Sequence, residues 1–70
     1  MAEVVNVRLL KPGDKLKISH EATVVVVSNP MDGVWIFARY LSSLEDPSLE
    51  GTEDMIFAQD IKEVLEISGN

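Results

Sequence analysis

The 70-residue sequence contains no cysteine, which excludes disulfide bonds, thiolate metal ligands and a cysteine nucleophile. It contains a single histidine, which excludes paired-histidine metal motifs. It also has neither a glycine-rich phosphate loop nor a nucleophile elbow around a serine. A chain this short would have to build a catalytic site across subunits. We therefore predict that the protein is not an enzyme and that it holds no cofactor and no metal.

Targeting signals and long apolar segments are missing as well. The first residues carry no basic region followed by an apolar run, so we expect neither a signal peptide nor a membrane span. The absence of cysteine fits a reducing compartment and favours a cytoplasmic protein. The length allows a single domain, residues 1–70, and the hydrophobic fraction of 46% is typical of a globular fold.

Positive charge is scarce, since the net charge is −6 and residues 41–70 carry eight acids against one lysine. An acidic surface repels phosphate backbones, which argues against direct nucleic-acid binding. The only basic area lies within residues 8–17 and is either an exposed strand face or a phosphate-contacting edge. Its members are Arg8, Lys11, Lys15 and Lys17.

Short apolar segments separated by turn residues predict strands over most of the chain. Residues 3–10 alternate partly, and residues 15–19 alternate cleanly after the Lys-Pro-Gly-Asp turn at 11–14. Residues 22–28 and 34–41 are rich in β-branched and aromatic residues. The Asp-Gly pair between these two segments predicts that they form a hairpin.

The last third of the sequence predicts a loop followed by short elements. Residues 42–54 contain proline, glycine and five acids, which indicates an exposed loop with at most one helical turn. Residues 55–58 predict a short buried strand, residues 59–64 a single helical turn, and residues 65–67 a last strand. Because no amphipathic helix can cover an open sheet, we predict an all-β fold, a small barrel of five or six short strands.

Two segments, LLKPGDKLKI and MIFAQDIKEVLEI, resemble the start and the end of SH3-like small β-barrels, including the KOW-type modules. The resemblance spans about residues 7 to 67 and implies that the helical turn near residues 59–64 leads into a strand that closes the barrel. The same Pro-Gly-Asp turn occurs in swapped-hairpin transcription factors of the AbrB and MazE type. SH3-like barrels bind peptides, nucleic acids or large complexes, so this resemblance does not fix a function.

The hairpin is apolar on both faces. The four consecutive valines at 24–27 place side chains alternately on opposite sides, and Trp35 and Phe37 oppose Ile36 in the same way on the partner strand. Only one face can line so small a barrel, so the other needs cover from the N-terminal strand, from residues 42–54 or from a second copy. The candidate partner contacts are Val24, Val26, Trp35 and Phe37.

Acidic side chains form a second candidate binding region. They could bind a basic protein surface or a cation, or simply be solvated, and their spacing matches no calcium loop. These residues are Glu45, Asp46, Glu50, Glu53 and Asp54. His20 and Glu21 would point to opposite faces of a strand, so they do not converge on a metal site or an acid–base pair, and we expect His20 to be an exposed turn residue.

We therefore predict a small binding or assembly module that acts through protein–protein contacts and forms a homo-oligomer. Two alternatives follow from other features of the sequence. The first is a nucleic-acid-associated regulator of the AbrB or MazE type that uses the basic area of residues 8–17. The second is an acidic inhibitor that mimics nucleic acid through its C-terminal half and captures a basic protein.

Overall fold

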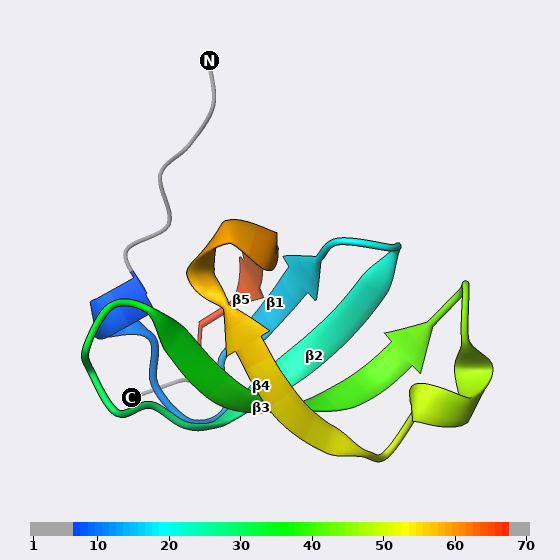
Figure 1. Ribbon diagram of the computed structural model, residues 1–70, viewed down its shortest axis with the longest axis horizontal. Helices are drawn as coiled ribbons and strands as arrows, with labels where there is room; N and C mark the ends of the chain where they lie inside the picture. The colour runs from blue at the N-terminus through cyan, green and yellow to red at the C-terminus, as the bar shows by residue number, and fades with distance from the viewer. Residues whose placement is uncertain (1–6, 68–70) are drawn as a thin grey trace.

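The computed structural model describes residues 7–67, which form one antiparallel sheet of five strands in the order β4-β3-β2-β1-β5 (Figure 1). Only single 3₁₀ turns accompany the strands, so the prediction of an all-β fold of short strands is confirmed. The elements in chain order are η1 Val7–Leu9, β1 Lys15–Ile18, β2 Ala22–Ser28, β3 Trp35–Ser43, η2 Pro47–Leu49, β4 Glu53–Phe57, η3 Ala58–Asp60 and β5 Ile61–Glu66.

The sheet curls until its two edge strands meet at one end. β4 and β5 occupy opposite edges of the sheet, yet only the three residues of η3 join them (Figure 1). Register shifts in the β2–β3 and β1–β5 pairs indicate bulges, which bend strands. The Ser19 backbone N–H donates to the Asp60 carbonyl over 2.9 Å and ties η3 to the β1–β2 turn. The helical turn expected near residues 59–64 is thus shorter and earlier, because Ile61 already pairs with β1.

The core fills the concave side of this sheet. Leu16, Val24 and Ile36 are fully buried, and Val26 is 2% exposed. Alternate residues of β1, β2 and β3 point inward, and these three strands correspond to the predicted segments 15–19, 22–28 and 34–41. Burial of each inward leucine, isoleucine or valine side chain stabilises the fold by about 1.5–3 kcal/mol. The buried hydrophobic residues are Val7, Leu10, Leu16, Ile18, Ala22, Val24, Val26, Ile36, Ala38, Ile56 and Ile61.

The strand predicted at residues 3–10 is wrong for the part that the structure describes. Residues 7–9 form η1, and Val7 and Leu10 are buried whereas Leu9 is 71% exposed. A spacing of three residues between buried positions suits a 3₁₀ turn. The Asn29 side-chain amide donates to the carbonyls of Val7 and Leu10 at 2.8 Å each. These bonds fix the turn from the hairpin loop. Residues 3–6 lie outside the described part of the chain.

The residues between η1 and β1 form the turn that the Lys-Pro-Gly-Asp segment at 11–14 predicts. The Asp14 carboxylate is buried and accepts a hydrogen bond from the Lys11 backbone N–H at 2.9 Å. Gly13 has φ of 97°, a conformation that glycine adopts without a steric penalty. The Gly13 N–H donates to the Val26 carbonyl and the Val26 N–H donates to the Asp14 carbonyl. The turn therefore continues the pairing of β1 with β2.

The loop expected at residues 42–54 is shorter in the structure, because β3 runs to Ser43 and β4 begins at Glu53. η2 lies between them, and the Asp46 carboxylate caps it by accepting from the Ser48 backbone N–H at 3.2 Å. The buried strand expected at 55–58 is also corrected. β4 lies at the sheet edge and buries only Ile56, so the residues on either side of it point outward.

Candidate functional site

An apolar patch covers the convex side of the β2–β3–β4 sheet. In the register of β3 with β4, Trp35 lies opposite Phe57 and Phe37 lies opposite Met55, so these four side chains share one face. The rings of Trp35 and Phe37 meet edge to face with centroids 4.9 Å apart. Phe37 and Met55 are each 39% exposed and Phe57 is 43% exposed. We call the following residues the outer patch: Val25, Val27, Trp35, Phe37, Met55 and Phe57.

Charged residues that are already paired border the outer patch. Arg39 follows Phe37 on this face, and its guanidinium lies 2.7 Å from the Glu53 carboxylate on β4. Lys15 lies opposite Val25 in β2, and its ammonium lies 2.9 Å from the Glu66 carboxylate on β5. All four side chains are about half exposed, so each pair contributes less than about 1 kcal/mol. The border is therefore electrically balanced.

The basic area predicted within residues 8–17 is partly neutralised in the fold. Lys15 pairs with Glu66, and Lys17 lies 4.0 Å from the Glu21 carboxylate. Both lysines sit on β1, whose exposed face therefore carries mixed charge. A phosphate-contacting edge would have to break these pairs.

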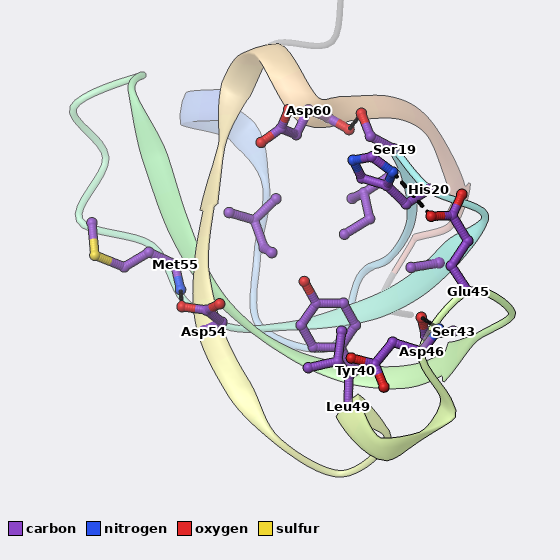
Figure 2. Close-up of a pocket in the computed structure, with 13 residues that line it drawn as sticks. Ser19, His20, Tyr40, Ser43, Glu45, Asp46, Leu49, Asp54, Met55 and Asp60 are labelled. Carbon is purple, nitrogen blue, oxygen red and sulfur yellow. Dashed lines mark hydrogen bonds and ion pairs between the residues drawn. The ribbon is translucent and has the colours of Figure 1, made fainter.

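The second candidate site is a cavity of about 310 Å³ at one end of the curled sheet (Figure 2). It is surrounded by the β1–β2 turn, β3, the loop that contains η2, β4 and η3. Its floor is apolar and includes Ile18, Ala22 and Ile56. Figure 2 shows the Tyr40 ring pointing into the cavity, whereas the Met55 side chain points away from it. The carboxylates that line the cavity belong to Glu45, Asp46, Asp54 and Asp60.

The cavity has a negative electrostatic character. Burial raises the pKa of the Tyr40 hydroxyl, and the charges of Asp54 and Asp60 raise it further. The negative charges of these two carboxylates disfavour the ionised phenolate. Asp54 accepts a hydrogen bond from the Met55 backbone N–H at 2.8 Å. Among residues 7–67, no lysine or arginine forms an ion pair with Asp46, Asp54 or Asp60.

His20 lies at the mouth of this cavity. Its side chain is 78% exposed, as expected for a turn residue, and its Nδ1 lies 3.3 Å from the Glu45 carboxylate. His20 and Glu21 both have positive φ, 67° and 57°, which turns the chain sharply between β1 and β2. The carboxylate that His20 contacts is thus 25 residues away in sequence, while Glu21 faces Lys17.

The structure divides the predicted hairpin contacts between two environments. Trp35 and Phe37 belong to the outer patch, where a partner can reach them. Val24 and Val26 are 0% and 2% exposed in the core, which corrects their assignment as partner contacts. Side chains in the core are unavailable to a partner of the folded protein. The valines available on the convex side are the half-buried Val25 and Val27.

The predicted acidic region is divided in a similar way. Glu45, Asp46 and Asp54 line the cavity, while Glu53 pairs with Arg39 at the border of the outer patch. Glu50 is exposed after η2 and lines neither site. The five acids therefore do not form one surface.

Sequence reasoning missed the residues that complete each site. Met55 and Phe57 alternate with the buried Ile56, so the period-2 pattern of β4 could have placed them on the outside. Tyr40 and Asp60 reach the cavity from β3 and η3, and no local pattern relates these two positions. Only the tertiary fold brings them together.

Within the described range 7–67, no group of three His, Cys, Asp or Glu residues is arranged to hold a metal ion. The same range contains no helix long and apolar enough to cross a membrane. Comparisons of the chain with protein-family models, curated proteins and solved structures found no match.

Proposed function

We propose that this protein is a non-enzymatic binding and assembly module that acts through protein–protein contacts at the outer patch. The proposal rests on one observation. The partly exposed side chains of Phe37, Met55 and Phe57 lie together with Trp35 on one convex face. The largest contiguous apolar patch on a typical monomer measures about 300–600 Å² and is often an interaction site. A second copy of the chain is the partner we assign to it.

The size of the outer patch is sufficient for a weak dimer. Aromatic side chains present about 200 Å² each, so these residues together leave on the order of 300 Å² exposed. Covering that area on two copies at about 25 cal/mol per Å² gives roughly 15 kcal/mol. Association costs on the order of 7 kcal/mol in lost freedom. The surplus of about 8 kcal/mol corresponds to a micromolar dissociation constant.

The charges around the outer patch support self-association over binding to a charged partner. Arg39 and Lys15 are each paired within the chain, with Glu53 and Glu66. A partner therefore needs an apolar surface and no excess of one charge. A second copy related by a two-fold axis presents the same apolar surface to the first.

Sedimentation equilibrium of the wild type and of two lysine variants tests the proposal. Phe37→Lys places a charge in the outer patch, and Leu44→Lys places one at a residue that is 77% exposed outside it. We expect a concentration-dependent dimer for the wild type and for Leu44→Lys, and a folded monomer for Phe37→Lys. A wild-type monomer at about 500 μM would refute self-association at the affinity estimated above.

A further inference from the structure

We propose that the cavity beside Tyr40 binds a lysine or arginine side chain presented by a segment of a partner protein. This inference goes beyond the proposed function, because self-association uses the convex face and the cavity opens at the end of the sheet. Binding at the cavity would bring a chemically different protein to the assembly.

The size and floor of the cavity fit one long side chain. Its volume of about 310 Å³ is at the lower end of the range for ligand sites, roughly 300–1,000 Å³. The floor of Ile18, Ala22 and Ile56 offers apolar contacts. The methylene segment of a lysine or arginine packs well on such a surface while its charged head stays near the rim. A hydrated inorganic cation would make no use of this floor.

The charge of the rim selects the charge of the occupant. Asp46, Asp54 and Asp60 line the cavity and have no lysine or arginine partner among residues 7–67. The acidic groups repel one another and would repel an anionic ligand, whereas a cationic head group relieves that repulsion. Charge complementarity thus favours a basic side chain over a neutral one.

Tyr40 adds a contact that a basic side chain can use. Its ring points into the cavity (Figure 2), and its hydroxyl forms no hydrogen bond with another residue of the described chain. A lysine ammonium or an arginine guanidinium near the ring gains a cation–π attraction. The phenol oxygen can also accept a hydrogen bond from either group.

Nuclear magnetic resonance titration of the ¹⁵N-labelled full chain tests the proposal. The probes are flexible glycine–serine peptides with one central lysine, arginine or glutamine. We expect the lysine or arginine peptide to shift the amide signals of Ser19, Tyr40 and Asp60, and the glutamine peptide to leave them in place. High salt should weaken this binding, since the rim is open to solvent.

Two double variants with the same change in net charge distinguish binding at the cavity from general electrostatic attraction to the acidic protein. Asp54→Asn with Asp60→Asn removes two rim charges, and the asparagine can still accept the Met55 N–H bond. We expect it to raise the dissociation constant of the basic peptide about tenfold, as for two partly exposed ion pairs. Glu50→Gln with Glu63→Gln changes acids outside the cavity, and we expect no more than about a twofold effect.

Several results would overturn the proposal. Equal weakening by both double variants would show that only the overall charge matters. Shifts centred on Phe37 and Phe57 would place the peptide on the outer patch. Binding of free 1,5-diaminopentane as tightly as the lysine peptide would assign the cavity to small amines. Circular dichroism of both variants checks that they fold, and none of these results would alter the sedimentation test of the outer patch.

Discussion

Truncation of two neighbouring residues of β3 should lower the free energy of unfolding by very different amounts. Ile36 is fully buried against β2 and β4, whereas Phe37 is 39% exposed on the convex face. Ile36→Ala removes three carbon atoms from the centre of the core and leaves a cavity that a rigid sheet cannot fill. Such substitutions cost about 2–5 kcal/mol, and we expect about 4 kcal/mol here. Phe37→Ala should cost about 1 kcal/mol in the monomer, since much of the ring already contacts water.

These costs are large compared with the stability of so small a domain. At about 0.05–0.15 kcal/mol per residue, a chain of this length has a free energy of unfolding of roughly 4–10 kcal/mol. Ile36→Ala should therefore leave the protein close to unfolding at room temperature. Phe37→Ala should lower the melting temperature by only about 4–8 °C.

Urea and thermal unfolding followed by circular dichroism measure the difference. The measurements should be repeated at several protein concentrations, because loss of a dimer contact would lower the stability of Phe37→Ala only where the dimer is populated. If Phe37→Ala proved more destabilising than Ile36→Ala at the lowest concentration, the assignment of the two faces of β3 would be refuted.

Three further predictions follow from single contacts. Asn29→Ala removes the two hydrogen bonds that its side-chain amide donates to the carbonyls of Val7 and Leu10, and it should lower the free energy of unfolding in urea by about 1–3 kcal/mol. Amide exchange near Leu10 as slow as in wild type would contradict this. Gly33 and Gly51 both have positive φ, but only at Gly33 would a new Cβ meet a side chain, at 3.2 Å. Gly33→Ala should therefore lower the melting temperature more than Gly51→Ala does, and equal melting temperatures would argue against that packing. An ultraviolet titration of Tyr40, the single tyrosine, should give a pKa above 10.0, the ordinary value for a phenol in an unfolded chain. The folded state then holds this proton more tightly than the unfolded state, so the group's contribution to stability is present below pH 10.0 and is lost as the pH rises through the folded-state pKa; a midpoint at or below 10.0 would contradict the placement of the ring.

The strands could be predicted from the sequence wherever one local pattern determines them. Alternation placed Leu16 inside β1, and the Asp-Gly pair marked the loop between β2 and β3. The prediction for the first segment failed because Asn29, 22 residues from Val7, holds the carbonyls that a strand would have used. A side-chain bond over that separation leaves no trace in the local pattern, so tertiary contact overrode it.

The candidate sites could be predicted only in part, because they too depend on contacts between residues that are distant in sequence. Trp35 and Phe37 indicated an apolar outer face, but the face that lines the core depends on the register with β4, which pairs Phe37 with Met55. The cavity depends on five elements of the fold, and Asp60 reaches it only because η3 bends back toward the β1–β2 turn. The resemblance to SH3-like barrels stays a prediction, since comparisons with family models and solved structures found no match.

Association of the protein through the outer patch can be tested by a dilution series in ¹H–¹⁵N correlation spectra of the wild type. We predict that the amide signals of Val25, Phe37 and Phe57 shift progressively as the concentration rises through the micromolar range to about 500 μM. Signals of the cavity residues Ser19 and Asp60 should stay in place. Spectra that do not change over this range, or that change first around the cavity, would contradict association through the outer patch.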